Sequence, residues 1–401
     1  MERREVKLGD IITYNKGYAF KSNEYTNTGK MVVRVTDFTL DSISDNDSVY
    51  LEPNDKYKKF IINTNDILIQ TVGSWANNPN SIVGKVVRVP DKCDKAYLNQ
   101  NIVRIIPNKD FDNTYLYYAL KANQFSMYCV LRGQGAANQA SITLATIFKF
   151  KFRAHFFSEQ KRIADILSTY DTLIENNNNR IKLLEQMAEN LYKEWFVRFR
   201  FPGYEDVEFE EKKPRGWQVG TEDKNHFAPT IFRYDEFGII GSFVRGKNIT
   251  AAQMIEGNIP VISAGLQPSG YHNEANVFGE NLTISASGAN AGYLQYNLND
   301  IWAADCSYYQ DDATIWFVYN TLKYLQPVIS NLQCGAAQPH VYPKNINRLC
   351  ILIPTEELIH KYNDSVKPYY DEIKVLNQHN QLLTQQIDLL LPRLMSGKLE
   401  V

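Results

Sequence analysis

Two stretches of this 401-residue chain, about 200 residues apart, carry apolar side chains at alternating intervals of three and four residues. This spacing keeps one seam on one face of a helix, so it predicts coiled-coil helices over residues 158–198 and 356–395. Each seam contains a single asparagine, and a lone polar seam residue fixes register because its amide needs a partner. The first seam is Leu167, Tyr170, Ile174, Asn177, Ile181, Leu184, Ala188, Leu191 and Trp195, and the second is Val366, Tyr369, Ile373, Leu376, Asn380, Leu383, Ile387, Leu390 and Leu394.

The segments that precede these helices also resemble each other. IQTVGS at 69–74 matches ISASGA at 284–289, and YYALK at 117–121 matches YNTLK at 319–323. GAANQASI at 135–142 matches GAAQPHV at 335–341 with one deletion. Each match is short, but they occur in the same order and each set is followed by a seam, which indicates an internal duplication.

The duplicated segments are rich in short β-prone runs separated by Asn, Asp, Gly and Pro, which predicts an α+β fold. The prolines and glycines of residues 198–217 indicate an ordered connector. Strands are expected at 31–35, 67–72, 82–89, 102–106, 259–262, 282–285 and 314–318, and short helices at 114–130 and 322–332. The predicted domains are residues 1–157, a helical spacer 158–200, residues 201–355 with the connector, and a helical spacer 356–401.

Local sequence also raises questions about the long helices. The four asparagines at 176–179 lower helix propensity, but the seam stays in phase across them, so the helix is predicted to continue. Pro368 is expected to kink the second helix, and Pro392 to mark its final turn.

Composition limits the class of protein. The chain is 44% hydrophobic and 22% charged, as soluble proteins are, and its start has no signal-peptide core. Without an apolar run near 18 residues, a cytoplasmic protein without a membrane span is expected. The five cysteines are scattered and lack a CxxC pair, which favours reduced thiols over a zinc site. The net charge of −2 does not by itself indicate a nucleic-acid partner.

Motifs for catalysis are missing from the sequence. GSFVRGKN at 241–248 fits GxxxxGK, but a P-loop needs Ser or Thr where this chain has Asn248. NNPN at 77–80 is only superficially similar to a methyltransferase motif, since no glycine-rich cofactor motif lies nearby. Nucleophile-elbow and HExxH patterns are also absent, so no catalytic residue and no metal site are expected.

Five segments resemble one family. LYKEWFVRFRFPG at 191–203, followed by PRGW at 214–217, resembles the central region of specificity (S) subunits of type I restriction-modification enzymes. FSEQKRIADIL at 157–167 is similar to the entry into that region, LLLPRLMSGKLEV at 389–401 to the family's C-terminus, and KLGDI at 7–11 to its opening. Residues 218–237 depart from the family pattern, which leaves open where the second domain's first strand begins.

The resemblance implies two β-rich target-recognition domains in a pseudo-twofold arrangement, joined by two long antiparallel coiled-coil helices. Each domain would read half of a split double-stranded DNA sequence, and helices of this length would form a spacer of roughly 50–60 Å. This subunit would carry no catalysis and no cofactor. Two modification subunits that bind S-adenosylmethionine would methylate adenine, and restriction subunits would cleave DNA using ATP, as in phage defence. A protein with two β-rich heads that bind carbohydrate or form a fibre is the alternative.

Three repeated places offer the Arg, Lys, Asn, Gln and Ser side chains that read bases or bind phosphates. A plain turn explains any single one of them, but not the glutamine repeated in the GAA-x-Gln motif. The first place is Ser74, Asn77 and Asn78, beside a Trp75 expected to pack, matched by Ser287 and Asn290; the second is Arg132, Gln134, Asn138, Gln139 and Ser141, matched by Gln333, Gln338 and His340; the third is Lys16 and Lys21, matched by Arg245 and Lys247, for phosphates. Trp195 and Phe196 are expected to pack the helix end, or to dock a partner subunit if they are exposed.

Overall fold

The computed structural model describes residues 3–39, 42–75, 81–135, 139–212, 226–334 and 339–401. The chain divides into two compact units. Unit 1 consists of Met1–Asn176 and His379–Val401, and unit 2 of Asn177–Gln378. Each unit therefore contains one strand-rich part and one portion of each long helix.

The two predicted long helices are present. Helix α5 spans Phe157–Tyr192 and continues as a π-helical turn over Lys193–Val197, and α9 spans Glu356–Met395. Helix α5 continues through residues 176–179 as predicted, and α9 includes Pro368 and Pro392. Every seam position of both helices is buried or half-buried, so the period found in the sequence marks the packed face.

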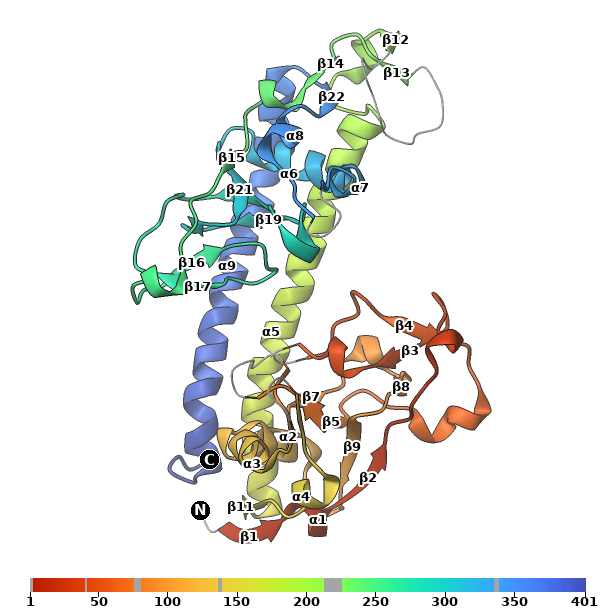
Figure 1. The fold of residues 1–401 in the computed structure, drawn as a ribbon, viewed down its shortest axis with the longest axis vertical. Helices are drawn as coiled ribbons and strands as arrows, with labels where there is room; N and C mark the ends of the chain where they lie inside the picture. The colour runs from red at the N-terminus through yellow and green to blue at the C-terminus, as the bar shows by residue number, and fades with distance from the viewer. Residues whose placement is uncertain (1–2, 40–41, 76–80, 136–138, 213–225, 335–338) are drawn as a thin grey trace. The chain divides into compact units, whose positions relative to one another are not determined.

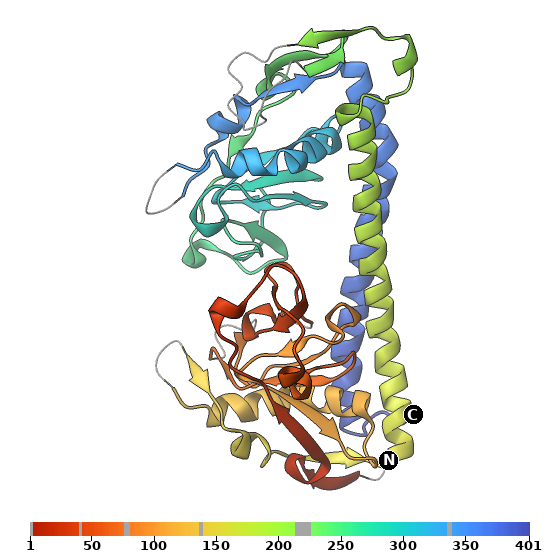
Figure 2. The ribbon, with the colours of Figure 1, turned by 90° about the vertical axis from the view of Figure 1, so that its right-hand side faces the viewer.

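Within unit 2, α5 and α9 run antiparallel and side by side (Figure 2). The Tyr362 hydroxyl donates to the Ala188 carbonyl at 2.9 Å, and Arg180 pairs with Glu372 at 2.6 Å. Moving from Ala188 back to Arg180 along α5 thus corresponds to moving from Tyr362 forward to Glu372 along α9. The Arg180–Glu372 pair is about half exposed and contributes little to stability. The aromatic and aliphatic seam therefore supplies most of the stability of the helix pair.

The strand-rich part of unit 1 contains a four-stranded antiparallel sheet, a smaller three-stranded sheet and two strand pairs, β1–β11 and β6–β10 (Figure 1). The four-stranded order is β2-β9-β5-β7, the three-stranded order is β4-β3-β8 with β3 and β8 parallel, and β1 pairs with β11. The bounds are β1 Arg3–Lys7, α1 Leu8–Ile11, β2 Ile12–Lys16, β3 Lys30–Val33, β4 Val49–Leu51, β5 Ile67–Gln70, β6 Val72–Gly73, β7 Val86–Arg88, β8 Tyr97–Leu98, β9 Ile102–Pro107, α2 Asn113–Lys121, α3 Asn123–Arg132, β10 Ala140–Ser141, α4 Leu144–Ile147 and β11 Lys151–His155.

Unit 2 repeats the two sheets and the β1–β11 pair in the same strand order. Its four-stranded order is β15-β21-β18-β19, its three-stranded order is β17-β16-β20 with β16 and β20 parallel, and β14 pairs with β22. The bounds are β12 Phe209–Lys212, β13 His226–Pro229, β14 Arg233–Glu236, β15 Val244–Arg245, β16 Ile259–Ile262, β17 Gly270–His272, β18 Asn281–Ser285, β19 Leu294–Asn297, β20 Trp302–Ala303, β21 Cys306–Tyr309, α6 Ile315–Tyr324, α7 Gln326–Ser330, α8 Pro343–Asn347 and β22 Cys350–Ile353.

The duplication extends to single backbone hydrogen bonds. In unit 1 the Ile142 N–H donates to the Thr71 carbonyl at 2.9 Å, and in unit 2 the Val341 N–H donates to the Ala286 carbonyl at 3.0 Å. These four residues lie at the matching positions of the repeated motifs in the sequence. The internal repeat therefore marks equivalent places in two copies of one fold.

A polar contact at matching positions joins the short helices to the long ones. In unit 1 the Tyr118 hydroxyl of α2 donates to Asp171 of α5 at 2.5 Å, and Arg88 lies 3.3 Å from the same carboxylate oxygen. In unit 2 the Asn320 amide of α6 donates to the Tyr370 hydroxyl of α9 at 3.1 Å. The positions match because Tyr118 and Asn320 share a place in the YYALK/YNTLK repeat.

Three expectations about secondary structure were wrong. Residues 314–318, predicted as a strand, contain the first turn of α6, and the helix predicted at 322–332 is split between α6 and α7. The run was misread because α6 is buried on all sides, so it has no polar face to show a helical period. The helix predicted at 114–130 is two helices, separated by the extended backbone of Ala122.

The described part of the departure from the family pattern, residues 226–237, contains β13, which pairs with β12, and β14. The first strand of the repeated fold in unit 2 is β14, and Phe237 follows it where Leu8 follows β1: the Phe237 N–H donates to the Leu349 carbonyl, as the Leu8 N–H donates to the Phe150 carbonyl. The position of this strand, left open by the sequence, is thereby fixed at Arg233–Glu236.

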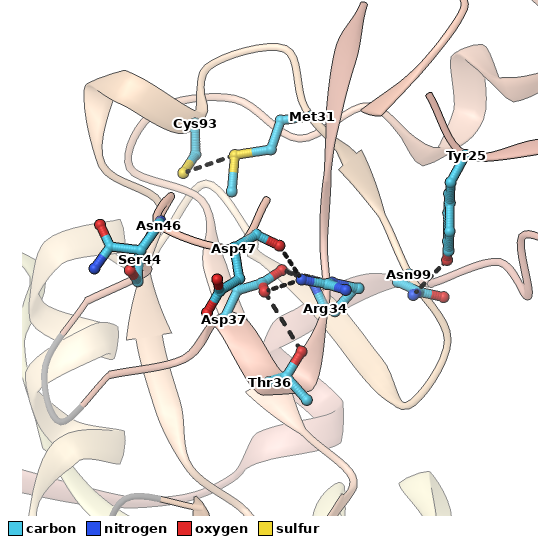
Figure 3. A network of polar contacts seen from close by, with 10 residues as sticks. All are labelled: Tyr25, Met31, Arg34, Thr36, Asp37, Ser44, Asn46, Asp47, Cys93 and Asn99. Carbon is cyan, nitrogen blue, oxygen red and sulfur yellow. Dashed lines mark hydrogen bonds and ion pairs between the residues drawn. The ribbon is translucent and has the colours of Figure 1, made fainter. Parts of the chain in front are cut away.

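Unit 1 contains a polar anchor beside its three-stranded sheet (Figure 3). Arg34 follows β3, and its guanidinium donates to Asp37 at 2.8 and 3.2 Å and to the Asp47 carbonyl at 2.6 Å. Asp37 is 5% exposed and also accepts the Arg34 N–H at 2.7 Å. A hydrogen bond to the buried carboxylate raises the pKa of Arg34, and the pair holds the turn that follows the strand.

Candidate nucleic-acid interface

Two of the predicted residues in unit 2 meet at one carboxylate, and a third lies beside one of them. Arg245, at the end of β15, and Ser287, after β18, both donate to Asp305, which directly precedes β21. His340 forms a backbone bridge with Ser287. The sequence placed Arg245, Ser287 and His340 in three separate motifs, and pairing of β15 and β18 with β21 brings these motifs together.

Asp305 was missed by sequence reasoning. It lies in none of the repeated motifs, and the contacts that reveal it join residues 60 and 18 positions away in the chain. The available signal was its place immediately before a strand of the repeated sheet, where unit 1 has another polar residue, Asn101.

Two further predicted residues of unit 2 bind its own backbone. The Gln333 amide donates to the Ala291 carbonyl at 2.8 Å, and the Asn290 amide lies 3.5 Å from the Ala264 carbonyl. Lys247 is exposed, and its carbonyl accepts the Trp302 indole N–H at 2.8 Å. Gln333 and Asn290 therefore stabilise loops, while the Lys247 ammonium lies 6.0 Å from the centre of the Trp302 ring on an exposed side chain. Gln338 lies outside the described residues.

In unit 1 the first and second predicted places adjoin. Strand β10 pairs with β6, which leads directly into Ser74, and Gln134 forms a backbone bridge with Ser141. Gln134, Gln139 and Ser141 are exposed. Gly135 has a φ of +153°, and a Cβ there would lie 2.0 Å from the Gln139 carbonyl oxygen. The glycine is thus required by the close approach of its backbone to Gln139.

The other predicted residues of unit 1 divide by exposure. Ser74 and Trp75 are half-buried, and the Trp75 ring packs against the core, as expected for Trp75. The exposed cations are Lys16 at the end of β2, Lys21, and Arg132, whose guanidinium lies 4.1 Å from the centre of the Tyr128 ring. Asn77, Asn78 and Asn138 lie outside the described residues.

Trp195 and Phe196 do not form an exposed docking surface. Their exposed fractions are 7% and 9%, and their rings lie 5.7 and 5.2 Å from the ring of Tyr362 in the core of unit 2. Both aromatic side chains lie in the π-helical turn that ends α5 and pack against Tyr362 of α9, so they are covered. They pack the helix end, which was the other expectation.

Three of the five cysteines are buried, Cys350 is half-buried and Cys334 is exposed. Burial raises the pKa of Cys129 and of Cys306 to about 12 and that of Cys93 to about 11, so these thiols stay protonated and are weak nucleophiles. Within the same part of the chain, no group of three His, Cys, Asp or Glu side chains could hold a metal ion. No described helix combines the length and apolar character needed to cross a bilayer.

Comparisons with known proteins agree on one family. A family described as type I restriction modification DNA specificity domain matches residues 2–186 and 240–385. The type I restriction enzyme MjaIX specificity subunit of Methanocaldococcus jannaschii is 27% identical over 319 residues, which are 76% of this chain and 73% of that protein. The MjaVIII specificity subunit of the same organism is 27% identical over 253 residues, which are 58% of this chain and 51% of that protein.

One solved structure has the same fold. The crystal structure of the type I restriction-modification S subunit from M. genitalium matches 98% of this chain and 96% of its own, with a TM-score of 0.55 and 17% sequence identity. The family match and this structure agree with the duplicated topology described above.

Proposed function

Because the chain belongs to the family of type I restriction-modification DNA specificity proteins, we propose that its two units read the two halves of a split double-stranded DNA sequence. The chain is the DNA-recognition subunit of such a complex. One observation carries the division into halves: two copies of one fold place different polar side chains at matching positions. Family membership does not favour the carbohydrate-binding or fibre-like alternative.

Each unit reads bases with side chains on the short strands and loops beside its four-stranded sheet. Exposed side chains on loops held by a rigid sheet can reach base edges, while nearby Lys and Arg bind phosphates and fix the register. In unit 1 these are Gln134, Gln139 and Ser141, with Lys16, Lys21 and Arg132 as cations. In unit 2 the base-reading candidate is His340, with Arg245 and Lys247 as cations.

The long helices set the distance between the half-sites. Helix α5 begins in unit 1 and ends in unit 2, and α9 begins in unit 2 and ends in unit 1. A pair of packed helices is stiff, so the gap between the two half-sequences becomes a fixed number of base pairs. This is the role of a spacer in a protein that reads a bipartite site.

Catalysis and cofactors belong to partner subunits in this proposal. Two modification subunits bind S-adenosylmethionine and methylate adenine within the site, and restriction subunits cleave DNA using ATP. The chain contributes recognition and assembly. The lack of catalytic motifs in its sequence supports this assignment. We place the complex in the cytoplasm, where the DNA lies.

Methylome sequencing tests the proposal in cells that carry the complete system, with and without this gene. We expect a split adenine-methylated motif that disappears when the gene is removed and returns when it is restored. The purified chain is the second arm, and it should neither bind S-adenosylmethionine nor methylate DNA by itself. A methylome unchanged by the gene would refute the recognition role, and methylation by the isolated chain would refute the division of labour.

A further inference from the structure

We propose that the residue immediately before the second strand of each four-stranded sheet, Asp305 in unit 2 and Asn101 in unit 1, determines which base its unit reads. In unit 2, Asp305 is a positioning residue that orients Arg245 toward a guanine. This inference rests on the proposed DNA-recognition function and assigns a base chemistry to one place in it.

The two positions are equivalent in the backbone. The Asn101 carbonyl accepts the Thr71 N–H at 2.8 Å, and the Asp305 carbonyl accepts the Ala286 N–H at 3.3 Å. Thr71 and Ala286 are themselves matched by the repeat. Asn101 and Asp305 thus hold the same place in two copies of one fold. Each directly precedes the strand, β9 or β21, that pairs with the strand ending in Lys16 or Arg245.

The neighbouring cations are equivalent as well. Lys16 ends β2 and Arg245 ends β15, and a glycine follows each. The Gly17 N–H donates to the Ile102 carbonyl at 3.0 Å, and the Gly246 N–H donates to the Cys306 carbonyl at 2.9 Å. Each unit therefore sets one cation beside one polar residue: Lys16 with Asn101, and Arg245 with Asp305.

The backbone is kept while the side chains differ, which is what two readers of different sequences require. In unit 2 Arg245 bonds one oxygen of Asp305, and the Ser287 hydroxyl bonds the other. The carboxylate is thereby held from two sides. In unit 1 the matching residues, Lys16 and Asn101, provide an ammonium and a neutral amide instead.

The Arg245 pair is placed for recognition rather than for holding the fold. The side chain of Arg245 is 42% exposed and that of Asp305 28% exposed, and an ion pair of this kind adds little stability. The contrast within the chain is Arg34, whose partner carboxylate is 4% exposed and whose guanidinium also binds a backbone carbonyl. Arg34 anchors a turn, whereas Arg245 presents its remaining donors to solvent.

The chemistry of the pair favours guanine. A guanidinium can donate two parallel hydrogen bonds to O6 and N7 of guanine, and this needs its plane to be fixed. Asp305 restrains the guanidinium through one Nη2 bond, which leaves other donors of the five for a base. The adjacent negative charge also disfavours a phosphate, so Arg245 is directed to a base edge.

The test is the methylated motif of the complete system carrying Arg245→Ala, Arg245→Lys or Asp305→Asn. We expect a G·C pair in one half of the wild-type motif. Arg245→Ala and Arg245→Lys should reduce discrimination at that pair about tenfold or more, since a good bidentate contact separates bases by that much. Asp305→Asn should relax the same base pair, and the other half should be unchanged.

Arg233→Ala is the matched control, because Arg233 is an exposed arginine of unit 2 with its own carboxylate partner, Asp235, at 3.4 Å. It should leave the motif intact. Thermal melting of each purified variant separates misfolding from altered reading, and Arg245→Lys keeps the charge if the alanine variant melts early.

Three outcomes would overturn the inference. The first is folded Arg245 variants that slow methylation of all sites equally with the motif unchanged, which would make Arg245 a phosphate contact. The second is Asp305→Asn with an unaltered motif. The third is an Arg245 or Asp305 variant that alters the same half of the motif as Asn101→Ala does, because the two positions belong to different units. A wild-type system without any split motif would instead refute the proposed function, so the two failures are distinguishable.

Discussion

The hydroxyl of Tyr118 lies 2.5 Å from the carboxylate of Asp171, a short bond that ties α2 to α5 in unit 1. Burial, with Asp171 next in effect, raises the pKa of Tyr118, so the phenol stays protonated and remains the donor. The side chain of Asp171 is 20% exposed and also pairs with Arg88. The contact is thus a charge-assisted hydrogen bond in a mostly buried site.

Tyr118→Phe should destabilise unit 1 by about 1.5–3 kcal/mol, because it removes a hydrogen bond to a charged group and leaves that group partly unsatisfied. Urea unfolding of the full chain measures the change. Tyr14→Phe is the control: Tyr14 is 46% exposed, and the same hydroxyl group is removed from the same unit. Equal stability of the two variants would show that the Tyr118 bond contributes nothing.

Acid should weaken unit 1 through His155. Its side chain is fully buried, its Nδ1 lies 2.9 Å from the Tyr115 hydroxyl, and its Nε2 has no hydrogen-bond partner among the described residues. Burial lowers the pKa of His155, and Arg3 acts in the same direction while Glu159 opposes it. As the pH falls, the His155 imidazole is therefore protonated near pH 6.5 in the unfolded chain but only at a lower pH in the folded chain.

The stability from His155 is therefore present above about pH 6.5 and declines as the pH falls toward the lowered pKa, by at most about 1.4 kcal/mol per pH unit. The urea midpoint should drop further between pH 7.5 and pH 5.5 for the wild type than for His155→Asn, which cannot titrate. An equal fall in both proteins would assign the acid sensitivity to other groups.

Lengthening both long helices should change only the gap in the DNA target. Seven residues inserted between Asn176 and Asn177 and seven between Gln378 and His379 keep the seam in phase and add about 10 Å, close to three base pairs. The methylome should retain both half-sequences with a longer gap. The insertion in α5 alone should abolish methylation, since it breaks the match between the helices. Methylation with the original gap by the doubly extended protein would rule out the spacer role.

Gln139→Ala should relax one half of the motif. Gln139 is exposed beside the tight Gly135 turn, and glutamine can pair bidentately with adenine at about 1–3 kcal/mol of discrimination. The altered half should differ from the half altered by Arg245→Ala, because the two residues belong to different units. Gln124→Ala, which removes another exposed glutamine of unit 1, is the control. A stable Gln139→Ala protein with an unchanged motif would make this glutamine a loop residue.

The architecture was predictable because its main signals are local and repeated. The seam of α5 and α9 fixed both helices, and β16 begins and ends where the apolar run of 259–262 does. Helix α6 was missed because Ile315, Trp316, Phe317 and Val318 are all buried, which leaves no periodicity to read.

The site was predictable only as separate pieces. Arg245, Ser287 and His340 were identified by type and repetition, but Asp305, which gathers two of them, depends on strand pairing between segments far apart in the chain. Trp195 and Phe196 show the converse, since large aromatic residues near a helix end fit both a core and an interface until the packing is known.

The division of the chain into units has a consequence for synthesis on the ribosome. Unit 2 is continuous, whereas the core of unit 1 includes Leu391 and Leu394, which pack with Ile163 and Leu167. Domains fold as their residues emerge, from the N-terminus onward. The unit whose translation starts first is therefore the last to close, and a ribosome that stops before Leu391 releases a chain with a complete second unit and an open first core.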